Sequence, residues 1–201
     1  MSLIYRGADI PTPGVTVVDW HEHGLTWALG QSGTRKRTDA LTQIVHHWTG
    51  GEGSYKGVHS VLTNRGLSVQ LYLAASGTVY QYADLDTVCA HAGSPTNGRS
   101  IGIEMQNVGH GAPGKVQRER LPETVHGREA MTSQFTPAQM AAAIALRKAL
   151  ASIVPVNVFA DSTVVPLWRR NTHVGDLGHY QISGQKRDPG THFMSEIAML
   201  D

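Results

Sequence analysis

One short stretch limits the possible folds of this chain more than any other. Residues 41–45 contain the neighbouring apolar residues Ile44 and Val45, and the chain then runs directly into His46-His47-Trp48-Thr49-Gly50-Gly51. Consecutive side chains of a strand point to opposite faces, so a strand that is apolar on both sides must be covered on both sides. We therefore predict a buried strand, from which only one of the two histidines can face a given side. Such a histidine is held rigidly enough to bind a metal, although a histidine satisfied within the core is the alternative.

Other regular elements are predicted along the rest of the chain. The clearest is a helix that begins at Pro137, where Thr136 is an N-cap and Gln139 completes a capping box. Hydrophobic periodicity and turn residues also indicate a helix at 55–65 and strands at 15–18, 25–29, 69–74, 78–82 and 100–106. Residues 107–134 show no sustained period, which is typical of a functional or disordered segment. Residues 154–171 are predicted to be loop with short extended segments.

The composition is that of an ordinary globular protein and argues against several classes. The chain has 201 residues, of which 40% are hydrophobic and 16% charged, enough for one domain with a sizeable core. A net charge of +1 argues against a nucleic-acid partner, and the single cysteine, Cys89, excludes an intrachain disulfide. No apolar run approaches the roughly 20 residues of a membrane span. Residues 1–20 lack the layout of a signal peptide, so we expect synthesis in the cytoplasm without one.

A single acidic residue interrupts an otherwise apolar strand. In residues 100–106, the side chains of Ile101, Ile103 and Met105 share one face, whereas Glu104 lies on the other. A carboxylate within an apolar strand indicates either a solvated sheet face or a functional site. The pattern alone leaves both interpretations open.

Residues 178–193 contain a second concentration of polar groups. His179 and Asp188 can each donate a lone pair to Zn²⁺, and a catalytic zinc usually has three protein ligands and a fourth position open to water. Lys186 is close enough in sequence to reach that open position, and the turn-forming Pro189-Gly190 would fix the direction of the chain. A solvated polar loop is the alternative, because a histidine and an aspartate at this separation are common.

Taken together, these segments resemble the zinc-dependent N-acetylmuramoyl-L-alanine amidases, which share a fold with peptidoglycan recognition proteins. The resemblance covers about residues 40–196 and rests on six motifs in the same order. The motifs are Ile44-Val45-His46-His47 with Thr49-Gly50, Gly77-Thr78-Val79-Tyr80-Gln81, Ala90-His91-Ala92-Gly93, Asn97 with Ser100-Ile101-Gly102-Ile103-Glu104, Phe135-Thr136-Pro137-Ala138-Gln139, and Gly178-His179 with Lys186-Arg187-Asp188-Pro189-Gly190. The resemblance implies an α/β fold in a single domain, with a central mixed β-sheet flanked by helices. Residues 41–201 would form the zinc amidase catalytic domain, and residues 1–40 an N-terminal extension packed on it.

The resemblance also implies a metal site. By position, His46, His179 and Asp188 would be the ligands of one catalytic Zn²⁺. His173 is a rival to His179 for the second ligand, because the gap from His179 to Lys186 is about one residue shorter than in many relatives.

The same resemblance implies a reaction and a role for five further residues. Glu104 would act as acid and base, Lys186 would stabilise the oxyanion, and His47, His91 and Asn97 would line the substrate groove. The implied reaction is hydrolysis of the amide bond between N-acetylmuramic acid and L-alanine, with zinc lowering the pKa of water toward about 7.

The biological role admits more than one prediction. We expect a monomeric, bacteriolytic endolysin that acts on peptidoglycan or muropeptides, reaching the cell wall after release, with no nucleic-acid partner and no membrane span. The long segment 107–134 and the basic clusters at 35–37, 115–120 and 169–170 favour a polymeric substrate. A cytoplasmic amidase that recycles anhydro-muropeptides is one alternative. A non-catalytic peptidoglycan-binding module, which would be expected to lack the third ligand, is another.

Overall fold

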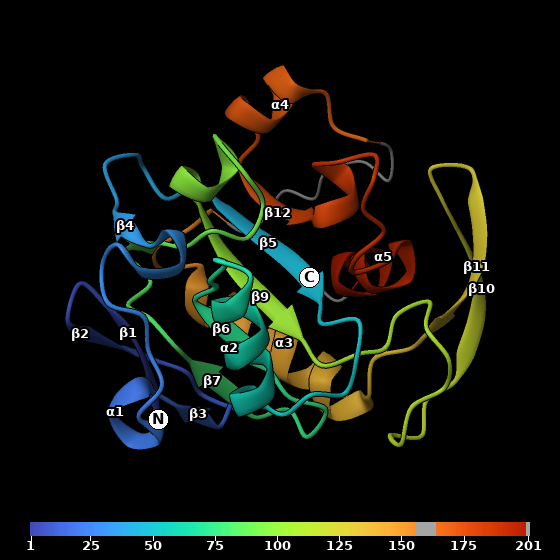
Figure 1. Ribbon diagram of the computed structural model, residues 1–201, viewed down its shortest axis with the longest axis horizontal. Helices are drawn as coiled ribbons and strands as arrows, with labels where there is room; N and C mark the ends of the chain where they lie inside the picture. Colours follow the sequence, from blue (N-terminus) through green and yellow to red (C-terminus); the bar gives the residue numbers. More distant parts are fainter. Residues whose placement is uncertain (156–163, 200–201) are drawn as a thin grey trace.

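The computed structural model describes residues 1–155 and 164–199 and is built around a six-stranded mixed sheet (Figure 1). The sheet and its main helices are formed by β3 (Val17–Val18), β5 (Gln43–Trp48), α2 (Tyr55–Asn64), β6 (Leu71–Leu73), β7 (Val79–Gln81), β9 (Ser100–Met105), α3 (Pro137–Leu150), β12 (Gly175–Gly178) and α5 (Thr191–Met199). The strand order is β12-β5-β9-β6-β7-β3. β5 pairs in parallel with both β12 and β9, whereas β6 and β7 form an antiparallel pair. The predicted α/β fold with a central mixed sheet flanked by helices is confirmed.

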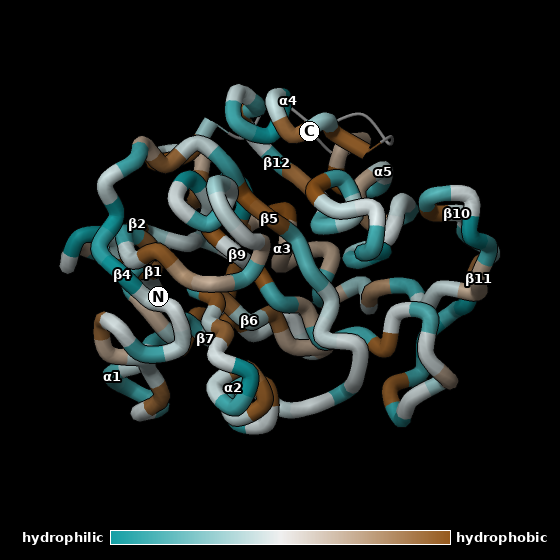
Figure 2. Tube along the Cα trace, turned by 45° about the horizontal axis from the view of Figure 1, so that its top comes forward, coloured by the Kyte–Doolittle hydropathy of each residue, from teal (hydrophilic) through white to brown (hydrophobic). Residues whose placement is uncertain are grey.

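Different elements cover the two faces of the sheet. On one face, apolar residues of the strands such as Ile44 pack against α3 and α5 in a core that includes Leu146 and Phe193. On the other face, α2 packs through Leu62 against a second apolar cluster that includes Tyr72. Figure 2 shows the hydrophobic residues concentrated along the central strands. Because β5 is covered on both faces, its successive side chains enter different surroundings.

The start of α3 follows from local sequence alone. The Thr136 hydroxyl accepts a hydrogen bond from the backbone N–H of Gln139 at 3.1 Å, and the Gln139 side-chain oxygen accepts one from the Thr136 N–H at 3.2 Å. Pro137 lies in the first turn, where a backbone N–H would have no partner within the helix, so the lack of an N–H in proline costs no hydrogen bond. The predicted capping box is therefore confirmed.

Among the described residues, no helix has the length and apolar character needed to cross a bilayer.

The first forty residues contribute the edge strand β3 to the sheet, and other parts of them pack against it. They form the strands and short helices β1 (Ser2–Tyr5), β2 (Ala8–Pro11), β3, α1 (Trp20–His23), η1 (Gln31–Gly33) and β4 (Arg35–Lys36). Leu3 and Val17 belong to the main apolar core. The predicted strand at 25–29 is wrong, because these residues pair with no other strand. Trp27 instead packs against α2 and donates its indole N–H to the Thr63 hydroxyl at 2.8 Å, so the apolar alternation there reflects packing and not a β-ladder.

Residues 107–134 are not irregular as predicted, because they contain the hairpin of β10 (Arg120–Val125) and β11 (Arg128–Ser133). The turn is made by His126 and Gly127, both with positive φ, and a histidine is an uncommon residue for that conformation. The hairpin forms its own two-stranded sheet, and the positions that alternate in burial along β10 carry Glu123 as well as Val125, so burial there does not appear as a period of apolar residues in the sequence. The remaining short elements are β8 (Thr87–Val88), η2 (Thr96–Arg99), α4 (Leu167–Thr172) and η3 (His179–Gln181). The helix α4 corrects part of the loop predicted at 154–171, of which residues 156–163 lie outside the described residues.

Candidate active site and metal centre

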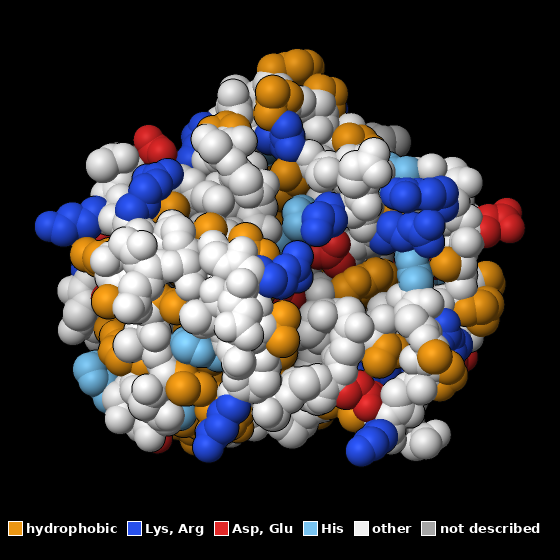
Figure 3. Space-filling view, in the orientation of Figure 1, with side chains coloured by type: hydrophobic (Ala, Val, Ile, Leu, Met, Phe, Trp, Pro, Cys, Tyr) orange, Lys and Arg blue, Asp and Glu red, His pale blue; other side chains and the backbone are white. Residues whose placement is uncertain are grey.

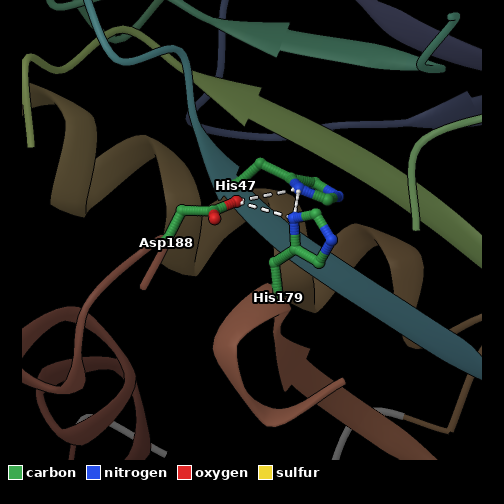
Figure 4. A group of neighbouring side chains, drawn as sticks. All are labelled: His47, His179 and Asp188. Carbon is green, nitrogen blue, oxygen red and sulfur yellow. Dashed lines mark hydrogen bonds and ion pairs between the residues drawn. The ribbon is translucent and has the colours of Figure 1, made fainter. Parts of the chain in front are cut away.

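Two segments that are far apart in the sequence bring three side chains together at the carboxyl ends of β5 and β12. His47 lies on β5, His179 begins η3 immediately after β12, and Asp188 lies on the loop that follows (Figure 4). The Nδ1 atoms of the two histidines are 2.9 Å apart. Oδ2 of Asp188 lies 3.1 Å from Nδ1 of His47 and 2.9 Å from Nδ1 of His179. Because β12 and β5 are parallel neighbours, their carboxyl ends bring these residues together.

The surroundings favour the forms of these groups that bind metals. Burial, reinforced by the neighbouring His179 ring, lowers the pKa of His47 to about 4, so its imidazole is neutral at pH 7. Burial alone would raise the pKa of Asp188, but hydrogen bonds with His179 and His47 outweigh it and hold this pKa well below its usual range. Metal ligands must be deprotonated, and these two groups meet that requirement.

The donor atoms also fit a zinc ion. Two imidazole nitrogens and one carboxylate oxygen are a common ligand set of catalytic zinc, and the three atoms lie within 4.8 Å of one another. The second ring nitrogen of His47, Nε2, lies 3.0 Å from Nδ1 of His91. A metal-binding histidine usually has such a partner, which fixes the ring and leaves the other nitrogen free to bind.

His46 does not lie in the metal-binding group. The prediction that it is a zinc ligand is therefore wrong. His46 points to the opposite face of β5, where its Nε2 lies 2.6 Å from Oδ1 of Asp176 and its ring packs on Phe193. The Nε–H of Arg147 donates to the other oxygen of Asp176 at 3.1 Å, and all three polar side chains are buried. His47, which was expected in the substrate groove, occupies the place predicted for His46. The physical reason is the alternation of side chains along the strand.

Glu104 faces the same cavity from the adjacent strand. It lies opposite His47 in the parallel register of β5 and β9, and both line a cavity of about 420 Å³ together with Lys186. Burial raises the pKa of Glu104 to about 8, with a further contribution from the Asp188 carboxylate and opposition from Lys186 and Arg65. Its Oε2 is buried and has no hydrogen-bond partner among the described residues. Such a carboxyl group can exchange a proton close to neutral pH.

His91 reaches the cavity, but Asn97 does not line it. A side chain at Gly102 would come within 2.7 Å of the His91 ring, so the absence of one allows this ring to lie against β9. The Oδ1 atom of Asn97 accepts hydrogen bonds from the backbone N–H groups of His91 and Ala92, at 3.2 and 2.7 Å. Asn97 therefore shapes the loop that carries His91, which corrects the prediction that its side chain lines the substrate groove.

The rest of the cavity is formed by a glycine-rich turn and by α2. Figure 3 shows a hollow near the centre of this face, where acidic and basic side chains lie together. Gly50 and Gly51 line one part, and Val58 and Val61 of α2 provide an apolar wall. Arg65, at the end of the same helix, adds a cation that is not among the site residues predicted from the sequence. No sequence signal would have singled it out, because arginine is common at the end of an exposed helix.

His173, the rival for the second ligand, lies outside the metal-binding group. It follows α4, and its Nε2 atom is 3.2 Å from the backbone oxygen of Asp176. The structure brings His179, and not His173, to His47 and Asp188.

Fold and site together define a class of protein. A candidate metal centre, a carboxyl group and a lysine share one cleft of an α/β domain, as expected of a metal-dependent hydrolase. Residues 37–191 match the family model described as N-acetylmuramoyl-L-alanine amidase. The chain belongs to this family, and its predicted enzyme class, an N-acetylmuramoyl-L-alanine amidase, is confirmed.

Solved structures with a similar fold include amidases and recognition proteins. The endolysin amidase LysCS from Clostridium intestinale aligns with a TM-score of 0.58 and 20% identity, over 95% of this chain and 97% of that chain. A Drosophila peptidoglycan recognition protein, PGRP-LB, in complex with tracheal cytotoxin aligns with a TM-score of 0.56 and 14% identity, over 90% and 92% of the two chains. The E. coli amidase AmiD, in complex with an anhydro-muropeptide substrate, aligns with a TM-score of 0.50 and 20% identity, over 87% and 66%. A search of curated protein sequences gives no match.

Proposed function

We propose that this protein is a zinc-dependent amidase that hydrolyses the bond between N-acetylmuramic acid and L-alanine in peptidoglycan. The observation that carries the proposal is the convergence of His47, His179 and Asp188 beside Glu104 in one cavity. These three side chains would hold the zinc ion. When bound, zinc would polarise the scissile carbonyl and make water more acidic.

Each remaining residue has a role that follows from its position. The pKa of Glu104, about 8 in the absence of metal, would fall beside a bound cation, so that the carboxylate would accept a proton from the attacking water and return it to the amine of L-alanine as that group leaves. The Lys186 ammonium would lie near the negative charge that develops on the carbonyl oxygen. A cation fixed there before the reaction stabilises the transition state without having to reorganise.

The cavity suits a muropeptide. Its volume of about 420 Å³ lies within the roughly 300–1,000 Å³ usual for small-molecule sites, and the apolar wall of α2 can exclude water from the reacting groups. The two cations Lys186 and Arg65 complement the carboxylates of a peptidoglycan stem peptide.

We further propose a bacteriolytic role at the cell wall, where the protein would act after release. The endolysin amidase LysCS, which aligns over almost the whole length of both chains, supports this role. AmiD, whose structure holds an anhydro-muropeptide, supports the alternative of an enzyme that acts on soluble fragments.

Digestion of two substrates tests these proposals. Purified peptidoglycan and a soluble anhydro-muropeptide are incubated with the protein, with and without a chelator, and the products are identified by mass spectrometry. Free stem peptide released from intact wall in a chelator-sensitive reaction is the expected result. Cleavage of the soluble fragment alone would indicate recycling, and no cleavage of either by zinc-loaded protein would contradict the proposed activity.

A further inference from the structure

The loop that carries Lys186 and Asp188 is held from outside the main sheet. The hairpin β10–β11 stands at the side of the molecule, beside α5 (Figure 1). At its turn, the ring Nε2 of His126 lies 2.9 Å from the backbone oxygen of Tyr180 and must donate to it. Next to the turn, Arg128 donates to the backbone oxygen of Gly184 at 2.9 Å. Both acceptors belong to the segment between His179 and Asp188.

Glu123 of β10 makes the most extensive of these contacts. Its carboxylate is buried and accepts hydrogen bonds from the Thr191 hydroxyl at 2.8 Å, the His192 backbone N–H at 3.2 Å and the Thr191 backbone N–H. These donors form the first turn of α5, whose N–H groups have no partner within the helix and favour an anionic acceptor. The same carboxylate lies against Gly190, where a side chain would come within 2.8 Å of it. Glu123 therefore fixes the chain directly after Asp188.

A second set of hydrogen bonds connects Glu123, through His110, to Arg187, which precedes Asp188. The Oε2 atom of Glu123 lies 2.9 Å from Nε2 of His110. The opposite nitrogen of that ring accepts a hydrogen bond from Arg187 at 3.2 Å, so Nε2 carries the proton and donates to Glu123. Arg187 is the residue between Lys186 and Asp188. The ring of His110 also packs edge-on against Trp48, which follows His47 on β5, at a centroid distance of 4.9 Å.

We propose that Glu123 is a positioning residue for Asp188 and Lys186. It holds the polypeptide on both sides of Asp188, through the first turn of α5 and through His110 and Arg187. The hairpin thus orders the loop relative to β5, which carries His47. A loop-borne ligand that is ordered in advance binds its metal more tightly, because less conformational freedom is lost on binding. The inference rests on the proposed function only for the identity of the metal.

Three variants of the 201-residue chain test this role. Glu123→Ala removes both connections. Glu123→Gln keeps an oxygen for Thr191 and His192 but places an amide N–H₂ against the donor of His110, so it breaks only the second connection. Glu129→Ala is the matched control, because Glu129 is an exposed acid of the same hairpin with no hydrogen bond or ion pair to any described residue.

Two readouts are measured at a temperature at which all three variants are folded. The first is the dissociation constant for zinc, obtained by competition with a chromophoric chelator. The second is amide hydrogen exchange at Tyr180 and Lys186, whose N–H groups bond within the loop, to the backbone oxygens of Asp188 and Ser183. Neither bond involves Glu123, so their exchange reports on the order of the loop.

Glu123→Ala is expected to raise the zinc dissociation constant at least about tenfold and to accelerate exchange at both amides. Glu123→Gln should give smaller changes of both quantities, and Glu129→Ala should match the wild type. Equal zinc affinity and equal exchange in Glu123→Ala and Glu129→Ala would overturn the proposal, even if Glu123→Ala melts at a lower temperature. If Glu123→Ala does not fold, a Glu123→Gln variant identical to the wild type in both readouts overturns it instead. A wild-type protein that binds no zinc would refute the proposed function, and the exchange data would then decide the role of Glu123 alone.

Discussion

Replacing Glu104 by glutamine should stabilise the metal-free protein at alkaline pH. In the folded state burial raises the pKa of this carboxyl group from 4.5 to about 8. Between these values the folded protein keeps a proton that the unfolded chain has already lost. The free energy of unfolding of the wild type therefore falls as pH rises through this window, because the folded state binds more protons than the unfolded one. Glutamine does not titrate, so the free energy of unfolding of Glu104→Gln does not fall in this way as pH rises.

The size of the change in the free energy of unfolding follows from the difference between the folded and unfolded pKa values of Glu104. A change from 4.5 to about 8 corresponds to a ceiling of about 5 kcal/mol, since one pKa unit equals about 1.4 kcal/mol. Glu104 is only partly buried, and relaxation and water penetration reduce the penalty of a charge in such a place. We therefore expect the variant to gain about 2 kcal/mol over the wild type between about pH 5 and pH 8.5.

Urea denaturation of chelator-treated protein at these two pH values measures the gain. The metal must be absent, because a bound cation would lower the pKa of Glu104. Glu129→Gln, at an exposed position of the hairpin, serves as the control for loss of a carboxylate and should show no such pH dependence. A difference between Glu104→Gln and the wild type that is the same at both pH values would refute the reasoning.

Three further substitutions separate the roles of residues around the site. Lys186→Met should lower kcat about 100-fold on a muropeptide while zinc content stays that of the wild type, and an unchanged kcat would exclude an oxyanion role. His46→Ala should lower the free energy of unfolding by about 3 kcal/mol in urea, because it leaves the buried Asp176 carboxylate without one of its partners. A stability equal to that of the wild type would contradict the buried pair. Asn97→Ala should cost about 2 kcal/mol by the same measurement, because two backbone N–H groups of the loop carrying His91 lose their acceptor. A loss below about 0.5 kcal/mol would show that water replaces this acceptor.

The sequence predicted which segments form the site better than it predicted which side chains enter it. The strand β5 and the acid on β9 are predicted because each carries a polar group beside an apolar run, whereas the loop after β12 is predicted because it holds a histidine, a lysine and an aspartate close together in the sequence. The sequence does not show which of His46 and His47 is the metal ligand. Both side chains are buried, at 1% and 2% exposure, and both faces of β5 are covered. Only the three-dimensional position of His179 and Asp188 shows which face holds the metal-binding group.

The hairpin β10–β11 illustrates a different limit. Its strands have few buried residues, and its turn uses His126 where asparagine or glycine would have been a recognisable signal. Its polar residues look like a solvated surface in the sequence. In the structure, Glu123 is nevertheless buried, because its partners come from α5 and from His110. Contacts between segments so distant in the chain leave no local pattern.

The zinc content of the purified protein tests the central claim most directly. The wild type, His47→Ala and the exposed control His21→Ala are dialysed against zinc-free buffer after loading and analysed by atomic emission. One zinc ion per chain is expected in the wild type and in His21→Ala, and a loss of zinc in His47→Ala. A His47→Ala variant that keeps stoichiometric zinc, or a folded wild type that holds none, would contradict the central claim.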